Sequence, residues 1–358
     1  MLTLYSDNSR RIEIDGGKAI WSLVFLEDGK HLLSGGEDGL IRQWYVEDGT
    51  TVGETIRART GVEAIVLSND RKWIVSGEHK WATVWNRNTR QRVLTVAEHT
   101  SWVLTVDVSP DSTRFATGAM DKKVFIWDIL TGRRVIGPLE HADNPTSVKF
   151  SPDGDRIATA TWNCEVLQIY HAHTGQWLRT VPVATCSTNP IAWSSDSQRI
   201  FALSTNGVLR QTSVNTGAFL SEWTVPGGTD NSFVSIALAS NDKFIACFVG
   251  HSLSFWDAST GAQLGTVLDH PGGRLNSIAL SSDNNYVATG SEDGIITVRK
   301  LNNILPMSYL GGQRVVQQSQ PGCCADLQWQ VDALHDDVGT FLGTLSCVRL
   351  NTNPNQTS

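Results

Sequence analysis

The sequence has few cysteines and no long hydrophobic run. Six cysteines occur in 358 residues without regular spacing, and only Cys323 and Cys324 are adjacent. This is not the pattern of a disulfide framework, so we expect an intracellular compartment, the cytoplasm or the nucleus. No stretch approaches the roughly 18 apolar residues of a membrane span. The N-terminal segment MLTLYSDNSRR has no apolar core of the kind found in signal peptides. The sequence therefore predicts neither a membrane span nor a signal peptide.

An excess of positive charge is also absent. The chain has 29 Lys and Arg against 36 Asp and Glu, a formal net charge of −7. No basic run is longer than a pair such as Lys122-Lys123 or Arg133-Arg134. Nucleic-acid binders usually carry a basic excess or a basic stripe. The charge pattern therefore argues against a nucleic-acid partner.

Patterns that mark an active site are scarce as well. No glycine-rich segment matches a P-loop or a dinucleotide-binding loop. His171 and His173 share one face of an expected strand, with Cys164 nearby, and are candidate metal ligands. A metal site needs a third and a fourth ligand, and none is evident. We therefore expect no cofactor, no metal site and no catalytic residue.

A tight turn recurs along the chain at a nearly constant interval. Successive copies are 41, 42, 43, 42, 44 and 42 residues apart. The turns are Asp48-Gly49, Thr89-Arg90, Thr131-Gly132, Thr174-Gly175, Thr216-Gly217, Thr260-Gly261 and Asn302-Asn303. Such regularity indicates seven copies of one structural unit.

The unit at residues 98–139 indicates what each copy forms. Its segments VLTVDVS, RFATGA, KVFIWD and RVIGPL are short and separated by turns that contain Pro, Asp, Ser or Gly. Four such strands in about 42 residues make one propeller blade. We therefore predict an all-β fold, a seven-bladed β-propeller of four-stranded antiparallel blades over residues 1–310. A short irregular C-terminal tail, residues 311–358, is expected to be partly disordered.

Several residues of the repeat carry a family resemblance. Third strands end on Trp127-Asp128 and Trp256-Asp257, and Trp44 and Trp85 stand at the same place in other units. Three units open on a histidine that follows an acidic residue, namely His99, His141 and His270. The chain thus resembles the WD-repeat family over residues 1 to about 310, in particular the repeat arrays of fungal WD-repeat proteins. The resemblance implies a propeller that binds other proteins and has no catalytic activity of its own.

The resemblance also implies a hydrogen-bond network inside the blades, which joins a His, a Ser or Thr, an Asp and a Trp. The third unit has all four members: His99, Thr117, Asp121 and Trp127. The seventh unit has His270, Thr289 and Asp293, and the first has Ser34, Asp38 and Trp44. A buried Asp is costly unless it is hydrogen-bonded, and His, Trp and hydroxyl groups can supply those bonds. We therefore interpret these residues as structural and not as a catalytic triad.

Ring closure requires a strand from outside the seven regular units, because an open sheet edge invites aggregation. In the family pattern an N-terminal strand completes the last blade, and we expect residues 10–14 to do so here. The segment Ile304–Leu310 competes for that place. Pro306 lacks an N–H group and confines its segment to a sheet edge, so both segments could contribute.

The family resemblance places partner binding on the upper face of the ring. That face consists of the loops leading into each first strand and the turns between second and third strands. The loop positions include Trp21, Trp102, Asn144 and Arg274. The turn positions include Glu37, Met120, Trp162 and Glu292. Because Trp and Arg are enriched at binding hot spots, Trp102 is the leading candidate.

Two functions from different classes follow from these expectations. The first is a scaffold, a monomeric propeller that binds proteins or peptides within a larger assembly, without membrane or nucleic acid. The alternative is a propeller enzyme of the hydrolase or lyase type, with a site in the central channel. Such an enzyme needs convergent ionisable groups on several inner strands. The expected inner strands are apolar, with Asp107 and Lys149 as their charged residues, which favours the scaffold.

Overall fold

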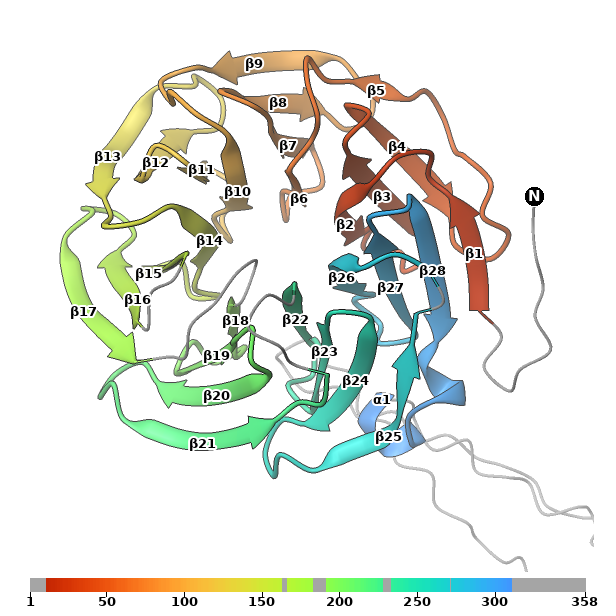
Figure 1. The fold of residues 1–358 in the computed structure, drawn as a ribbon. Helices are drawn as coiled ribbons and strands as arrows, with labels where there is room; N and C mark the ends of the chain where they lie inside the picture. The colour runs from red at the N-terminus through yellow and green to blue at the C-terminus, as the bar shows by residue number, and fades with distance from the viewer. Residues whose placement is uncertain (1–10, 163–165, 183–190, 228–232, 271, 311–358) are drawn as a thin grey trace, which may run out of the picture. The chain divides into compact units, whose positions relative to one another are not determined.

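The computed structural model describes residues 11–162, 166–182, 191–227, 233–270 and 272–310. These residues form seven four-stranded antiparallel sheets, set as blades around a central channel (Figure 1). The prediction of an all-β, seven-bladed propeller is confirmed. The predicted tail, 311–358, and the candidate ligand Cys164 lie outside the described residues.

In blades 1 to 6 the strands are paired in chain order, from the innermost to the outermost strand, whereas the outermost strand of blade 7 is β1. Blade 1 contains β2 (Ile20–Phe25), β3 (His31–Gly36), β4 (Leu40–Tyr45) and β5 (Ile56–Arg57). Blade 2 contains β6 (Ala64–Leu67), β7 (Trp73–Gly77), β8 (Ala82–Asn86) and β9 (Arg92–Val96). Blade 3 contains β10 (Val103–Val108), β11 (Arg114–Ala119), β12 (Lys123–Asp128) and β13 (Arg134–Glu140).

The remaining blades complete the ring. Blade 4 contains β14 (Pro145–Phe150), β15 (Arg156–Thr161), β16 (Val166–His171) and β17 (Trp177–Pro182). Blade 5 contains β18 (Ile191–Trp193), β19 (Arg199–Leu203), β20 (Val208–Ser213) and β21 (Phe219–Thr224). Blade 6 contains β22 (Val234–Leu238), β23 (Phe244–Val249), β24 (Ser252–Asp257) and β25 (Gln263–Asp269). Blade 7 contains β26 (Leu275–Leu280), β27 (Tyr286–Ser291), β28 (Ile295–Lys300) and β1 (Arg11–Asp15).

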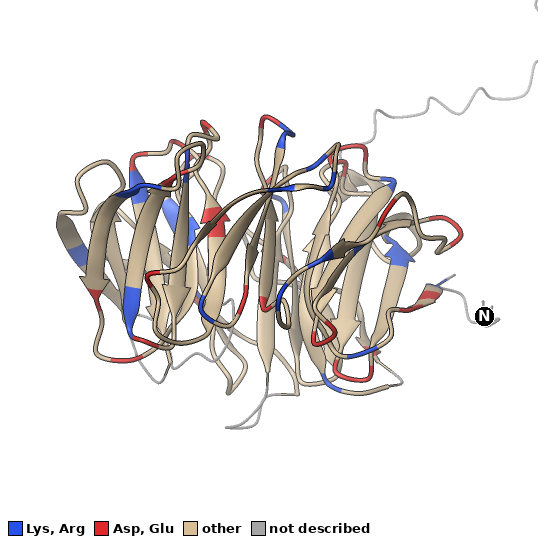
Figure 2. Ribbon diagram, turned by 90° about the horizontal axis from the view of Figure 1, so that it is seen from above, with Lys and Arg blue, Asp and Glu red and all other residues tan. Residues whose placement is uncertain are grey.

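The alternating strand directions define two faces of the ring. The loops into each first strand and the turns between second and third strands lie at one end of the blades, which we call the upper face. The other two kinds of turn lie at the opposite end, the lower face. Acidic and basic residues are found mainly in the loops at the two ends, whereas the strands are mostly uncharged (Figure 2).

The hydrophobic core lies between neighbouring blades and not within single sheets. Phe115 and Trp127 of blade 3 are fully buried in one cluster with Val75 and Val84 of blade 2. This placement follows from the sequence, because both faces of a blade's sheet are covered by adjacent blades. The strands of blade 3 accordingly contain near-continuous buried runs such as Val124–Trp127.

Strand β1 fills the outer edge of blade 7, where it pairs antiparallel with β28 and sets Glu13 opposite Thr297. Ile14 is buried in a cluster that spans blades 7 and 1 and includes Ile296 and Trp44. The inner strands of these two blades are also joined, since the Leu23 N–H donates to Ser277 Oγ at 3.0 Å.

The segment Ile304–Leu310 is not the strand that the sequence indicated as a competitor for closure. It follows a 3-10 helix, η1 (Leu301–Asn303), and ends in the short helix α1 (Met307–Leu310). Leu305 and Leu310 pack into the core between blades 6 and 7. Tyr309 donates from its hydroxyl to Asp257 Oδ2 at 2.8 Å. The physical reason is that β1 occupies the edge of β28 and that Pro306 has no N–H to offer a sheet.

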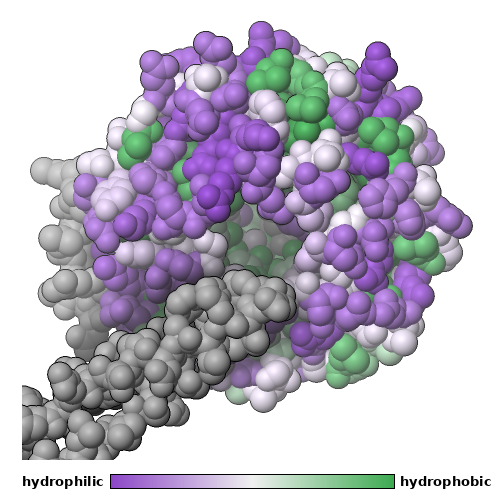
Figure 3. Space-filling view, turned by 180° about the vertical axis from the view of Figure 1, so that it is seen from behind, coloured by the Kyte–Doolittle hydropathy of each residue, from purple (hydrophilic) through white to green (hydrophobic). Residues whose placement is uncertain are grey.

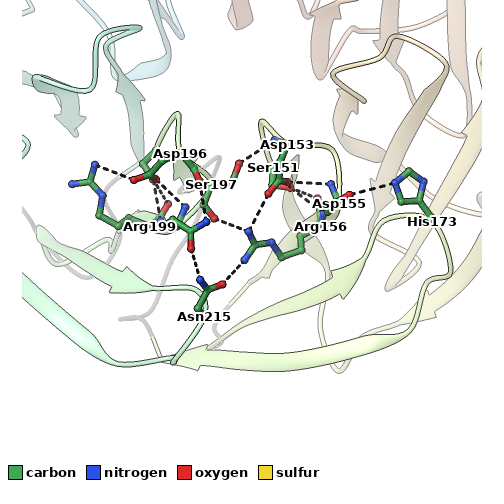
Figure 4. A network of polar contacts seen from close by, with 11 residues as sticks. Ser151, Asp153, Asp155, Arg156, His173, Asp196, Ser197, Arg199 and Asn215 are labelled. Carbon is green, nitrogen blue, oxygen red and sulfur yellow. Dashed lines mark hydrogen bonds and ion pairs between the residues drawn. The ribbon is translucent and has the colours of Figure 1, made fainter.

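On the lower face, polar side chains link the turns of successive blades. Between blades 4 and 5, Ser197 Oγ accepts a hydrogen bond of 3.0 Å from the Asp153 N–H (Figure 4). Arg156 bonds to Asp153 in its own blade and to the Ser197 carbonyl and the Asn215 side chain in the next, at 3.1, 3.0 and 2.9 Å. These contacts hold neighbouring blades together at the end of the ring away from the candidate site.

Candidate functional site

A cavity of about 230 Å³ lies at the centre of the ring, where residues from six of the seven blades converge. Its described lining residues are Trp21, Glu63, Leu104, Met120, Thr146, Trp162, Phe233 and Asn276. The space-filling view from behind looks onto the opposite, lower face, where the central channel is a hollow with hydrophobic residues in its depth (Figure 3). The predicted residues Trp21, Met120 and Trp162 therefore converge on one cavity.

Most of the cavity wall comes from one repeated position of the inner strands. In each of five blades, one backbone N–H closes the lower-face turn between the first and second strands. These N–H groups belong to Leu26, Ser68, Ser109, Ser151 and Ser281. The wall residue stands five positions before each of them. Counted this way, the equivalent wall residues are Trp21, Glu63, Leu104, Thr146 and Asn276. The strand register thus presents one side chain from each of five blades to the same point.

Glu63 is the one ionisable residue among the described lining residues. Its own N–H bonds to the Gly77 carbonyl at 2.9 Å, and its carboxylate has no hydrogen-bond or ion-pair partner among the described residues. Burial raises the pKa of Glu63 to about 7. Desolvation disfavours the charged form when no cation compensates it, so the cavity holds a carboxyl group that changes its protonation state near neutral pH.

Two neutral polar groups share the cavity with Glu63. Thr146 is buried, with a 4% exposed surface, and its Oγ1 has no hydrogen-bond partner among the described residues. Asn276 donates from Nδ2 to the Ile20 carbonyl at 3.2 Å. A buried polar atom without a partner is uncommon in native structures and marks a place where a ligand or water can bind.

Six of the eight predicted partner-binding residues form three pairs that the sequence did not reveal. Backbone N–H groups of the turns donate to carbonyls of the loops, at 2.8 to 2.9 Å, in three blades. The pairs are Met120 with Trp102, Trp162 with Asn144, and Glu292 with Arg274. In blade 1 the Glu37 N–H donates to Ala19 and not to Trp21. Trp21 is therefore an inner-strand residue, two places further along than the loop position predicted for it.

Trp102, the leading candidate, lines the surface beside the cavity and not the cavity itself. Its partly buried indole packs edge-on against the His79 ring, with 4.8 Å between centroids. His79 also contacts Trp81, whose ring lies 5.3 Å below the Arg59 guanidinium. Trp102 thus belongs to an aromatic cluster between blades 2 and 3.

Arg274 lies next to Phe233, a cavity residue that sequence reasoning missed. Its guanidinium lies 5.9 Å from the ring centroid of Phe233 and 4.0 Å from the Glu292 carboxylate. The Phe233 carbonyl accepts the Gly250 N–H at 2.8 Å, so Phe233 is the blade 6 counterpart of Trp102. Aligning Gly250 with the turn residue Met120 would have been the signal for it.

The four-residue network of blade 3 is complete. His99 Nδ1 lies 2.9 Å from Asp121 Oδ2 and Nε2 lies 2.8 Å from Thr117 Oγ1. Thr117 Oγ1 also accepts from Trp127 Nε1 at 2.9 Å. Burial lowers the pKa of His99, although Asp121 opposes this effect. With all donors matched and the hydroxyl fully buried, the network is a packing device.

Blade 7 departs from the network that the sequence predicted. His270 Nε2 lies 3.1 Å from Thr297 Oγ1 on the third strand. Its partner is thus Thr297 and not Thr289 of the second strand. Asp293 accepts from the Gly273 N–H at 2.8 Å and from Ser291. The reason is the missing Trp: Arg299 stands in its place, so no indole N–H fixes a second-strand hydroxyl.

Blades 1 and 2 keep shorter versions of the network. Trp44 donates to Ser34 at 2.8 Å, while Asp38 forms an ion pair with Arg42 at 2.7 Å. In blade 2 the buried Glu78, which sequence analysis overlooked, accepts from Ser76 at 3.2 Å and from the Arg59 N–H at 3.1 Å. Its position directly after a second strand was the available signal.

No group of three or more His, Cys, Asp or Glu side chains within the described ranges is placed to hold a metal ion. His171 and His173 have ring centroids 5.6 Å apart, and the nearest carboxylate oxygen to His173 belongs to Asp155 at 3.8 Å. In the part of the chain that the structure describes, no helix is long and apolar enough to cross a membrane.

The seven blades and the His–Thr–Asp–Trp network define a WD-repeat β-propeller, and the chain belongs to this family. The family model for the WD domain, G-beta repeat, matches residues 10–45, 90–128, 134–169 and 261–299. These matches fall mainly on blades 1, 3, 4 and 7.

A curated relative is Autophagy-related protein 16 of Arabidopsis thaliana. It is 26% identical to this chain over 306 residues, which cover 84% of the chain and 51% of that protein. The chain thus spans about half the length of the curated relative that it matches.

Proposed function

We propose that this protein is a non-catalytic scaffold that holds other proteins on its upper face, around the mouth of the central channel. The observation that carries the proposal is the cavity in which Trp21, Trp162 and Phe233 converge with Met120. Aromatic residues and Met are enriched in the cores of protein interfaces. A concave apolar site with a few polar groups is also the usual form of a binding pocket.

The WD-repeat family and the relative that is 26% identical both support a role in protein interaction. The name of that relative is Autophagy-related protein 16. We therefore propose that the assembly served by this propeller acts in autophagy. Loss of the gene should then reduce autophagic degradation in the organism that encodes it, and unchanged degradation would reject this part of the proposal alone.

An enzyme in the channel has less support. Catalysis by general acid and base, or by an activated nucleophile, needs two or more ionisable groups in mutual reach. Among the described lining residues Glu63 is the single ionisable side chain. Asp107, a charged residue of the inner strand β10, is instead held between blades by Lys149 at 3.2 Å and by the Phe150 N–H at 2.8 Å.

The scaffold is tested by affinity purification and mass spectrometry with three tagged forms of the full chain. Trp162→Ala removes a wall of the cavity, and Trp102→Ala removes the neighbouring aromatic cluster. The matched control is Trp177→Ala, because Trp177 is 55% exposed on the outermost strand of blade 4. We expect the two upper-face variants to lose partners that the control retains, at equal melting temperature. Identical partner sets in all three forms would overturn binding at this face.

A further inference from the structure

The polar atoms of the cavity share one property, which is that each can accept a hydrogen bond from a ligand. Thr146 Oγ1 is buried without a hydrogen-bond partner, and desolvation alone shifts the pKa of the Glu63 carboxyl, with no hydrogen bond or charge from another described residue. Asn276 donates from Nδ2 to the Ile20 carbonyl at 3.2 Å, and its Oδ1 can accept a hydrogen bond from another donor. A ligand that fits these groups must therefore be rich in donors.

The remaining wall is apolar and aromatic. Trp21 and Trp162 are partly exposed in the cavity and carry no cation over their rings among the described residues. Phe233 has one side occupied by Arg274, which Glu292 neutralises from 4.0 Å. Indole faces attract cations and also pack against aliphatic stems. The occupant should thus combine a hydrocarbon stem with a positive end.

We propose that this cavity binds the side chain of a lysine from a partner protein. The ammonium group has three donors and no acceptor, and Glu63, Thr146 and Asn276 each offer an acceptor. The four-carbon stem would lie against Trp21 and Trp162. An arginine has five donors in a planar fork, and three acceptor residues would leave some of them without a partner. This inference rests on the proposed function, since the lysine is supplied by a protein held on the upper face.

The charge of Glu63 gives the site a pH dependence. A lysine binds the ionised carboxylate, whereas burial raises the pKa of the empty site's Glu63 to about 7. Lowering the pH from 8 to 6 protonates most of the Glu63 population, so affinity should fall about tenfold. A cavity without Glu63 should lose this dependence.

The ionisable groups on the surrounding elements leave Glu63 without a resident cation. Strands β2, β6 and β7 contain no ionisable residue. The residues after β7 bring Glu78, bonded to Ser76, and His79, packed on Trp102. Strand β10 brings Asp107, paired with Lys149, and β3 brings His31, paired with Asp28 at 2.6 Å.

The test uses the full chain, ¹⁵N-labelled on tryptophan, titrated with N-acetyl-lysine amide at pH 8 while the indole N–H signals of Trp21 and Trp162 are followed by NMR. N-acetyl-norleucine amide is the probe without charge, and N-acetyl-arginine amide is the competing cation. We expect lysine to bind in the roughly millimolar range, at least tenfold tighter than norleucine and tighter than arginine. At pH 6 lysine binding should weaken about tenfold.

Glu63→Gln should weaken lysine binding at least tenfold and remove the pH dependence, while Glu54→Gln, at an exposed acid outside the cavity, should change neither. Thr146→Val gives a second, milder loss. Equal binding of lysine and norleucine, tighter binding of arginine, or no effect of Glu63→Gln would each overturn the lysine site. If the lysine site fails while Trp162→Ala still loses protein partners, the scaffold stands. If the lysine site fails and Trp162→Ala also keeps all protein partners, the proposal of partner binding at this face is rejected as well.

Discussion

The Leu23 N–H donates a 3.0 Å hydrogen bond to Ser277 Oγ, across 254 residues of sequence. This bond ties the inner strand of blade 1 to that of blade 7, at the place where the ring closes. The same kind of bond recurs elsewhere, from the Ile65 N–H to Ser22 Oγ at 2.9 Å and from the Val148 N–H to Thr105 Oγ1 at 3.2 Å. The inner strands are thus held in the alignment that brings the cavity residues to one point.

Removing β1 should open the ring. Deleting residues 1–15 takes away the partner of β28 and the Ile14 side chain, which is 3% exposed. A milder test is Ile14→Ala, which should lower the free energy of unfolding by about 2–5 kcal/mol, as for other buried aliphatic side chains. Thermal and urea denaturation measure both changes. An unaltered melting temperature for the truncated chain would contradict closure by β1.

The blade 3 network should depend on the hydroxyl of Thr117 and not on its shape. Thr117→Val keeps the shape but leaves Trp127 Nε1 and His99 Nε2 without their hydrogen-bond partner. A lost partner for a buried polar group costs about 1–3 kcal/mol, so we expect a destabilisation of about 2 kcal/mol or more. Thr117→Ser retains the hydroxyl and should lose less. Equal stability of Val and wild type in urea denaturation would disprove this role.

Buried histidines should make the propeller less stable in acid. Burial lowers the pKa of His270 to about 4, from an ordinary value of 6.5. Between these values the unfolded chain binds more protons than the folded chain, so the free energy of unfolding must decrease as pH falls through this window. The full effect for His270 is of the order of 3 kcal/mol.

The measurement is urea denaturation at several pH values between 7.5 and 4. His270→Gln should show a shallower loss of stability than wild type, and His173→Gln should not, because the side chain of His173 is 47% exposed. If the two variants had the same slope against pH, the buried His270 would not be responsible.

Glu63 should affect stability with the opposite sign. Burial raises its pKa from 4.5 to about 7 in the folded chain. The folded chain therefore binds the extra proton, and the stability associated with the neutral form is lost as pH rises through about 7. We expect Glu63→Gln to raise the melting temperature at pH 8 and to leave it nearly unchanged at pH 5. A melting temperature raised equally at both pH values would show that the gain is not electrostatic. Glu54→Gln is the matched control, because Glu54 is exposed and lies outside the cavity.

The sequence by itself determined the architecture. Seven turns at a near-constant interval specify seven units, and short strands with turn residues between them specify a blade, because both signals are local. The network of His99, Thr117, Asp121 and Trp127 could likewise be located from spacing, since its members lie within one repeat.

Only the tertiary structure decided how residues of different repeats meet. The cavity depends on the register of inner strands around the ring. The sequence assigned Trp21 to a loop position that lies two residues earlier, and this error separated it from its true equivalents Glu63 and Thr146. The partner of His270 was also decided in three dimensions, because Arg299 replaces an indole and Thr297 takes up the histidine. Whether Glu63 meets a cation depends on the distances between side chains of different blades, and these distances cannot be read from the sequence.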